Sequence, residues 1–354
     1  MNRLHVIIPA GGVGSRLWPL SRKDRPKFLL DLRMSGKSLL QETIDRLAPI
    51  AASFTIVTGR AHEQAVRAQI PQGLDVTVLV EPQGRDSMPA IGLAAYVIRQ
   101  RFGDEAPIAS FAADHAITQP QVLLDCVERA LEVAQKGYIV TIGLRPLTPS
   151  TAYGYIAPGE PFEMESPEKG SIVRSFVEKP DEETAKQYCE QGYLWNAGMF
   201  IMTAGTLARA LTRFHPDMDT HLSAIGSQWG SESFAQTLSE EWPTLTKIAI
   251  DHAIAEPLAS EGGVAVVPAT DMGWTDVGDF DALAQISSEG QALRIDSPDS
   301  FVRSLTGQKI VLVGAPNVAV IATEDAILVV DRNRAQDVKH VVDQLTQRGE
   351  GELL

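Results

Sequence analysis

Short apolar runs alternate with amphipathic segments through the first 144 residues of the chain. Five of the runs are rich in β-branched residues and have the length of buried parallel strands. Four segments between them carry apolar residues at helical spacing. The predicted strands are 3–10, 53–59, 74–81, 107–114 and 137–144, and the predicted helices are 38–47, 60–70, 87–102 and 122–136.

This alternation of strands and helices predicts an α/β fold with a doubly wound sheet, mixed but mostly parallel, because right-handed crossovers place helices on both faces. Ligands of such sheets bind beyond the carboxyl ends of the strands. We therefore expect the loops after Ala10, Val80 and Ala113 to share one rim of the molecule.

The pattern becomes less regular after residue 144 and changes again after residue 290. The middle region is expected to build a second wall of the cleft, and the end of the chain holds four short β runs and a closing helix. We predict a catalytic domain over 1–290 and a small β-rich domain, resembling part of a β-helix, over 291–354, whose residues suggest no chemistry of their own. In the middle region we expect a strand at 171–180 and helices at 181–190, 203–214 and 232–255, and the closing helix lies at 335–348.

Charge and composition exclude several classes of partner. The formal net charge is −14, and an acidic surface of this kind repels a nucleic-acid backbone. The sequence contains neither a run long enough to span a membrane nor a signal peptide, so we expect a cytoplasmic protein without a membrane partner. Cys126 and Cys189 have no disulfide or metal-site spacing, which predicts two reduced thiols.

A glycine-rich, basic segment at 10–27 stands out against this acidic background. Three glycines follow the first predicted strand, where bare N–H groups can face an anion. The basic residues behind them are Arg16, Arg22, Lys23, Arg25 and Lys27. The segment therefore predicts a focused site for an oligophosphate such as a nucleoside triphosphate, although a tight turn followed by a solvated basic loop is the alternative.

Two common phosphate-binding motifs are absent from this segment. No Lys-Ser or Lys-Thr pair follows the glycines at the spacing of a P-loop. Leu17 stands where the dinucleotide-binding motif needs a third glycine, and the second strand ends in Thr58, Gly59 and Arg60 without an acidic residue for a ribose. These departures argue against a dinucleotide-dependent dehydrogenase.

The string AGGVGSRLWPLS…RPK resembles the signature of the sugar-1-phosphate nucleotidylyltransferases. Further motifs follow in the same order and resemble the mannose-1-phosphate guanylyltransferase branch of that family. The resemblance extends over about residues 4–290, and the β tail also fits it. The motifs are ADH at 113–115, YGYIAP at 153–158, FVEKP at 176–180, WNAGMF at 195–200 and GWTDVGDF at 273–280.

The resemblance implies transfer of GMP from GTP to α-D-mannose 1-phosphate, giving GDP-mannose and pyrophosphate by in-line displacement with Mg²⁺ as cofactor. It assigns Arg16 and Lys27 to the triphosphate and the leaving pyrophosphate. It pairs Asp114 with Asp276 as metal ligands, and Asp114 also counts as catalytic. The other nucleotide-binding residues are expected to be Ala10, Gly11, Gly12, Gly14 and Ser15.

The same resemblance places the guanine in the loop 81–90 and the sugar phosphate near three later motifs. Glu81 could accept hydrogen bonds from the ring N–H and the exocyclic amine of guanine. Two questions stay open at this point. Trp195 and Trp274 either contact the ligand or only pack. The side chains of Arg22, Lys23 and Arg25 contact either the ligand or solvent. The expected base-loop residues are Glu81, Gly84, Asp86 and Ser87, and the expected sugar-phosphate residues are Gly154, Glu178, Lys179 and Asn196.

Several alternatives to this function are compatible with the sequence. One is the same chemistry on another hexose or heptose 1-phosphate, and another is a catalytically silent paralogue that binds GDP-mannose. Phosphomannose isomerase activity is not expected, because about 65 residues beyond 290 are too few for a cupin barrel. The β tail and its closing helix offer surfaces for a homodimer.

Overall fold

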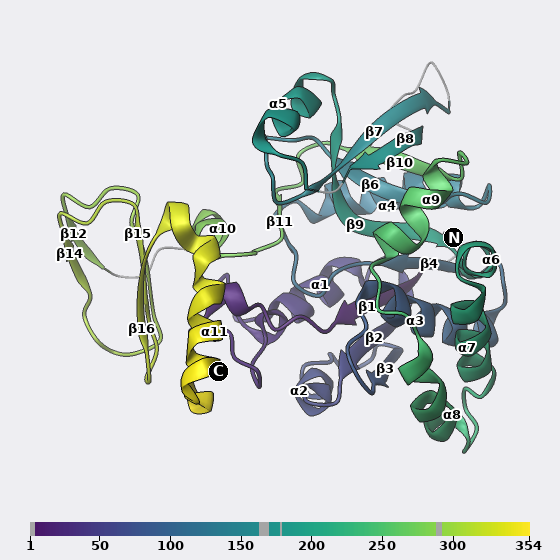
Figure 1. Cartoon of the computed structure of the whole chain (residues 1–354), viewed down its shortest axis with the longest axis horizontal. Helices are drawn as coiled ribbons and strands as arrows, with labels where there is room; N and C mark the ends of the chain where they lie inside the picture. The colour runs from purple at the N-terminus through teal and green to yellow at the C-terminus, as the bar shows by residue number, and fades with distance from the viewer. Residues whose placement is uncertain (1–3, 163–169, 178, 288–291) are drawn as a thin grey trace.

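A computed structural model describes residues 4–162, 170–177, 179–287 and 292–354 of the chain, and its centre is a nine-stranded sheet (Figure 1). The strand order is β3-β2-β1-β4-β9-β6-β10-β8-β7. The strands are β1 (Leu4–Ala10), β2 (Ala51–Gly59), β3 (Val76–Glu81), β4 (Pro107–Ser110), β6 (Ile139–Leu144), β7 (Gly154–Pro161), β8 (Ser171–Val177), β9 (Leu194–Thr203) and β10 (Val264–Ala269).

The sheet is mixed, as predicted. Strands β3, β2, β1 and β4 pair in parallel, as do β6 and β10, whereas β9 and β8 run against their neighbours. The carboxyl ends of β1 and β3 therefore lie on one edge, and the pairs Ala10–Thr58 and Gly59–Glu81 define the register there. This edge is the rim at which ligand was expected.

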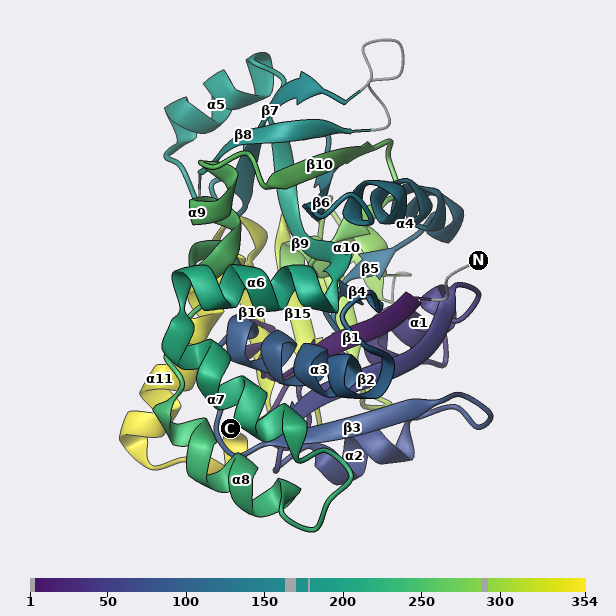
Figure 2. The ribbon, with the colours of Figure 1, turned by 90° about the vertical axis from the view of Figure 1, so that its right-hand side faces the viewer.

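Helices cover both faces of the sheet, which gives the doubly wound arrangement. One hydrophobic core lies under α1 (Leu39–Leu47), α2 (Glu63–Ala68) and α4 (Pro120–Ala134). A second core lies on the other face, under α3 (Ser87–Phe102), α6 (Ala204–Phe214) and α7 (Pro216–Ser227), which stand in front of the strands in Figure 2. Alternate side chains of β1 enter the two cores, as a strand buried on both faces requires.

The middle region departs from the sequence prediction in its helices. The prediction of one helix over 232–255 was wrong: α8 (Phe234–Glu241) stops before a turn at Trp242–Thr244, and a π-helical segment (Asp251–Ala255) leads into α9 (Glu256–Ala259). Pro243 interrupts the helical hydrogen bonds there. Helix α7 was not predicted, and Pro216 at its first turn separates it from α6. Helix α5 (Glu182–Glu190) lies where it was expected.

The four short β runs predicted for the C-terminal region are confirmed, and among its described residues one further short strand precedes them. Strands β12 and β14 pair in parallel, β13 and β15 do the same, and β16 closes one edge antiparallel to β15. A 3₁₀ segment, η6 (Arg332–Val338), and helix α11 (Lys339–Arg348) pack beside them (Figure 1). The five strands are β12 (Leu293–Ile295), β13 (Phe301–Ser304), β14 (Val311–Val313), β15 (Val318–Ala322) and β16 (Ile327–Asp331). The boundary predicted at 290–291 falls outside the described residues and stays a prediction.

One hydrophobic core joins this C-terminal region to the basic segment near the N-terminus. Leu17, Trp18 and Leu20 pack with α10 (Phe280–Ile286) and with buried side chains of β13, β15 and α11. The indole Nε1 of Trp18 donates to the backbone oxygen of Leu353 at 2.6 Å. The C-terminal region is therefore a supporting wall of the glycine-rich segment.

Two further structural observations bear on the sequence predictions. Cys126 is buried, Cys189 is partly buried, and both are free thiols. Among the described residues no helix is long and apolar enough to cross a membrane.

Candidate active site

The glycine-rich loop leaves the sheet at the end of β1. The hydroxyl of Thr58 donates to the Ala10 oxygen at 2.8 Å and fixes this strand end, after which Gly11, Gly12 and Ser15 are exposed at the rim. Gly14 has φ = 77° and starts the short 3₁₀ helix η1 (Ser15–Leu17). At Gly11 and Gly12 the loop thus presents main chain without side chains to the solvent, as a phosphate-binding turn requires.

Gly14 also allows Lys27 to lie against this loop. A Cβ atom at position 14 would stand 2.6 Å from the Cβ of Lys27, and the Lys27 N–H donates to the Val13 oxygen at 3.1 Å. Lys27 itself is buried at the start of a 3₁₀ turn. Its side chain is therefore held in a fixed place under the glycine loop.

A two-stranded ribbon brings the two predicted metal-binding aspartates to the same place. Strand β5 (Ala116–Ile117) pairs antiparallel with β11 (Trp274–Thr275), although their residues are far apart in the sequence. Gly273 permits this contact: it has φ = 61°, and a Cβ there would lie 1.8 Å from Thr118 Oγ1. Asp114 lies two residues before β5, and Asp276 directly follows β11.

Lys27 joins these aspartates. Its Nζ lies 2.6 Å from Asp114 Oδ2 and donates to the backbone oxygen of Asp276 at 2.7 Å. Burial opposes ionisation of Asp114, but Lys27 and His115 outweigh it and hold the pKa of that carboxyl below its usual value. Burial lowers the pKa of His115, while Asp114 and Asp276 act in the opposite direction. The structure therefore brings Lys27, Asp114 and Asp276 together, as the resemblance required.

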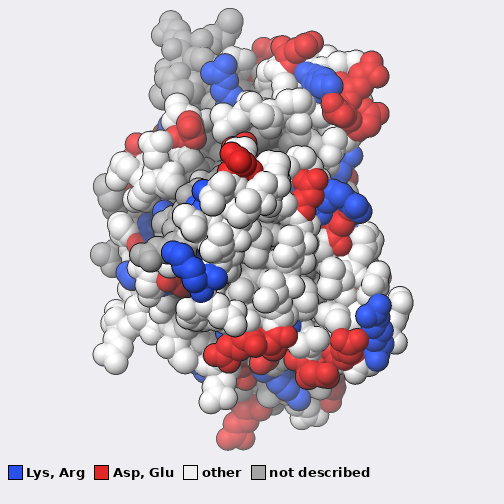
Figure 3. Space-filling view, turned by 90° about the vertical axis from the view of Figure 1, so that its left-hand side faces the viewer, with Lys and Arg blue, Asp and Glu red and all other residues white. Residues whose placement is uncertain are grey.

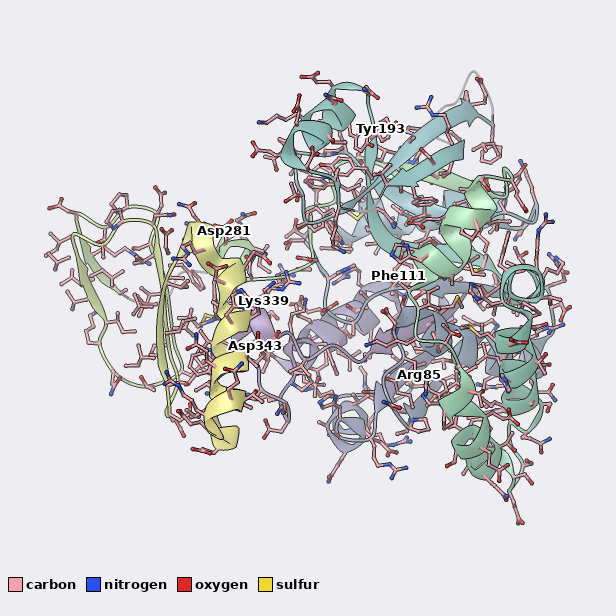
Figure 4. All side chains as sticks on the ribbon, viewed as in Figure 1. Arg85, Phe111, Tyr193, Asp281, Lys339 and Asp343 are labelled. Carbon is pink, nitrogen blue, oxygen red and sulfur yellow. The ribbon has the colours of Figure 1, made fainter. Side chains whose placement is uncertain are left out.

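A cleft of about 780 Å³ opens beside this cluster. Arg16 and Lys179 supply cations to its wall, and Asp276 lies at its edge. Trp195 and Trp274 line the cleft with Tyr153, which contacts both indole rings edge-on at 5.0 and 5.2 Å between centroids. The two tryptophans thus both pack and form part of the cleft wall. Figure 4 labels Asp281 and Lys339, which line it from α10 and α11.

Glu81 lies at the same rim, at the end of β3. Its carboxylate is buried between two glycines: a Cβ at Gly11 would lie 3.4 Å from Glu81 Oε1, and a Cβ at Gly84 would lie 3.9 Å from it. Burial raises the pKa of Glu81 to about 7. A side chain at either glycine position would therefore contact the Glu81 carboxylate.

Asp86 and Ser87, the other two predicted residues of the loop 81–90, lie at the start of α3. Asp86 caps the helix with φ = 69°, and its Oδ1 accepts from the Ser87 N–H at 2.8 Å. The Ser87 hydroxyl accepts from the N–H of Ile250 at 3.0 Å. Both predicted residues lie at the rim, and both have structural partners.

Gly154 and Asn196, two of the predicted sugar-phosphate residues, lie on neighbouring strands. Gly154 pairs with Asn196 across β7 and β9. The Asn196 amide donates to Asp251 Oδ1 at 2.6 Å, and its oxygen accepts from the Gly198 N–H at 3.1 Å. Lys179 is exposed in the cleft wall, whereas Glu178 lies outside the described residues.

Arg22 does not line the cleft. It is 8% exposed, donates to Leu353 O, and pairs with Asp325 at 2.8 Å. Lys23 and Arg25 lie in a separate surface recess. Of the five cations, Arg16 and Lys27 alone are thus placed at the candidate site within the described chain.

Sequence reasoning missed several residues of the cleft. Tyr153, Asp279, Gln336 and Lys339 line it, and the last two come from the C-terminal region that suggested no chemistry. A tyrosine in the YGYIAP motif and an aspartate in the GWTDVGDF motif could have been proposed from those motifs. Nothing in the local sequence around Gln336 indicates a site, because its contacts depend on the packing of η6.

Replacement of Gly14 by alanine is expected to lower the free energy of unfolding by about 1–3 kcal/mol, because a side chain at this backbone conformation is strained and overlaps Lys27. Urea unfolding followed by circular dichroism measures the change.

The matched control is Gly12→Ala. Nothing lies within 4 Å of a Cβ at Gly12, so the change is expected to stay within about 0.5 kcal/mol. Equal stability of the two variants would contradict the assigned packing of Gly14 on Lys27.

Comparisons with known proteins agree with this geometry. The profile of the family described as nucleotidyl transferase matches residues 5–292, and that of the MannoseP isomerase/GMP-like beta-helix domain matches residues 290–345. A mannose-1-phosphate guanylyltransferase from Escherichia coli (strain K12) is 35% identical over 99% of this chain and 75% of its own length. One from Salmonella muenchen is 36% identical with the same coverage.

A solved structure supports the same relationship. It is described as a mannose-1-phosphate geranyltransferase from Thermus thermophilus, is 31% identical, and superposes with a TM-score of 0.82 over 98% of this chain and 100% of that one. Ordered motifs, fold and near full-length identity thus agree: this chain belongs to the nucleotidyl transferase family, in the group of the mannose-1-phosphate guanylyltransferases.

Proposed function

We propose that the chain transfers GMP from GTP to α-D-mannose 1-phosphate and releases GDP-mannose and pyrophosphate. One observation carries the proposal: Lys27, fixed beneath the exposed glycine loop, joins Asp114 and the main chain of Asp276 at the rim of the sheet. A cation and two acids beside bare main chain suit a bound triphosphate. The names of the similar proteins support the choice of GTP and mannose 1-phosphate.

The reaction needs positioning and charge neutralisation more than covalent help from the protein. A phosphate oxygen of mannose 1-phosphate attacks the α-phosphorus of GTP, a new P–O bond forms, and the bond to the β-phosphate breaks, so pyrophosphate leaves. Lys27 and the main chain of the glycine loop bind the phosphates from below, and Arg16 binds them from the cleft wall. Lys179 binds the phosphate of the sugar.

Asp114 and Asp276 fit Mg²⁺, which prefers one or two carboxylates together with phosphate oxygens and water. No group of three or more acidic, histidine or cysteine ligands occurs in the described part of the chain, and phosphate oxygens of the substrates would supply further ligands for the ion. Bound there, the ion would neutralise charge on the phosphates. Lys27 compensates part of the charge of Asp114 at the same place.

The purified chain with Mg²⁺, GTP and mannose 1-phosphate is expected to release pyrophosphate and form GDP-mannose, measured by a coupled pyrophosphate assay and by chromatography. Asp114→Asn and Asp276→Asn are each expected to lower kcat/KM on the order of 100-fold, because each removes negative charge that binds the metal.

The control is Asp45→Asn, which alters an exposed carboxylate paired with Lys37 on the protein surface. It is expected to keep wild-type activity. Binding of GDP-mannose without turnover would instead support the silent paralogue, and faster turnover of another hexose or heptose 1-phosphate would change the sugar assigned here.

We assign guanine to the part of the rim beside Glu81. An ionised carboxylate can accept both the ring N–H and the exocyclic amine of guanine, and neither Gly11 nor Gly84 places a side chain against it. Because the pKa of Glu81 in the free protein is raised to about 7, the acceptor form is lost as the pH falls below that value.

The KM for GTP is therefore expected to rise by about tenfold per pH unit below pH 7. Glu81→Gln should raise the KM at pH 8, since an amide oxygen can satisfy only one donor well, and should flatten the pH dependence between pH 5.5 and 7. Steady-state kinetics across this range measure both effects. An unchanged pH profile in Glu81→Gln would place the base elsewhere.

We also propose that the chain forms a homodimer through its C-terminal strands. Six aliphatic side chains are 48 to 65% exposed there and define an aliphatic face: Leu293, Ile295, Val311, Val313, Ile327 and Val329. Figure 3, which looks onto this part, shows a broad uncharged surface with charged residues mostly around it. Two copies of a chain of net charge −14 repel each other least where uncharged surfaces meet, and an exposed aliphatic face is typical of a protein–protein contact, so a second copy can pair with it face to face.

Light scattering is expected to give twice the chain mass of 38.3 kDa for the wild type, and the monomer mass for Val313→Lys combined with Ile327→Lys, because charges on the aliphatic face oppose its burial. Met34→Lys, a change at an exposed apolar residue outside this face, is the control. A monomeric wild type would contradict the dimer.

A further inference from the structure

Arg16 of the glycine-rich segment is held by a residue more than 300 positions later in the chain. Its NH1 donates to Gln336 Oε1 at 2.7 Å. Gln336 lies in η6, whose Ala335 and Val338 are buried in the core shared with Leu17. The amide is exposed, but the backbone that carries it is anchored on both sides.

The other half of the same amide contacts the loop of Asp276. Gln336 Nε2 donates to Asp279 Oδ2, and Asp279 Oδ1 caps α10 by accepting from the Ala282 N–H at 2.9 Å. The side chain of Gln336 therefore links the arginine of the glycine segment to the loop that carries the second aspartate. Both partners, like Gln336, line the cleft.

The chemical type of this partner matters for an arginine that must bind phosphate. A carboxylate in the place of Gln336 would neutralise the guanidinium and compete with the substrate. A neutral amide orients the group and leaves its charge available, and Arg16 keeps four further N–H donors for phosphate oxygens. The amide thus reduces the orientational freedom of Arg16 without reducing its charge.

We propose that Gln336 is a positioning residue for the reaction, which orients Arg16 toward the phosphates of GTP and makes the C-terminal region a part of the active site. The inference rests on the proposed function, in which Arg16 contacts the triphosphate. Gln336 acts through Arg16 and is not itself required to touch the substrate.

A double-mutant cycle tests this inference in the full chain. Gln336→Ala is expected to raise the KM for GTP and lower kcat/KM for GTP by about three- to tenfold, the effect of losing one hydrogen bond to a charged group. The KM for mannose 1-phosphate should not change. In the Arg16→Ala background the further change Gln336→Ala should have no effect, because the residue it orients is gone.

Two other variants separate positioning from a general structural role. Gln336→Glu keeps an acceptor for Arg16 but adds a competing charge beside Asp279, so it should weaken GTP binding at least as much as Gln336→Ala. Arg334→Ala is the control, since Arg334 lies on η6 and pairs with Asp337 on the surface. It should behave as the wild type.

The inference is overturned if Gln336→Ala leaves kcat/KM for GTP unchanged, or lowers it equally with and without Arg16. Calorimetric Kd values for GTP in the same proteins distinguish this failure from failure of the proposed function. A wild type that binds GTP but makes no GDP-mannose refutes the proposed function. The double-mutant cycle of Gln336→Ala and Arg16→Ala, measured as Kd values for GTP, still tests the role of Gln336. A wild type that does not bind GTP overturns both.

Discussion

The ammonium of Lys27 is the point at which three distant parts of the chain meet. Because it is buried under the glycine loop, it needs partners that compensate for lost water, and it finds them in the Asp114 carboxylate and the Asp276 carbonyl. Each partner reaches it only because β5 and β11 pair. The positions of loop, strand end and ribbon therefore depend on one another, and none can shift alone without leaving a buried charge unpaired.

Much of the fold could be predicted from the sequence, because buried parallel strands are continuous apolar runs and the helices between them carry apolar residues at helical spacing. The helix at 87–102 agrees with the structure at both ends. The predictions were weaker where proline sets the boundaries: Pro216 starts an unforeseen helix, and Pro243 divides a foreseen one. Both helix boundaries follow from the backbone geometry of proline, which the pattern of apolar residues does not indicate.

The candidate site was predictable in its residue types but not in its geometry. The spacing of Asp114 and Asp276 in the sequence contains nothing about their distance in space, and the resemblance alone paired them. Arg22 belongs to the same basic segment as Arg16, yet it is buried and pairs with Asp325 of the C-terminal region. Gln336 had no signal at all. In each case long-range packing decides the role, and local sequence cannot encode it.

The hydrophobic core shared by Leu17, Trp18 and the C-terminal strands has a thermodynamic consequence. Any ligand that orders the glycine segment must also hold the C-terminal region more firmly, since the same side chains belong to both. Linkage is reciprocal, so whatever tightens or loosens the distal strands changes the affinity of the segment by the same factor. The surface farthest from the sheet is therefore energetically coupled to the glycine segment without contacting it.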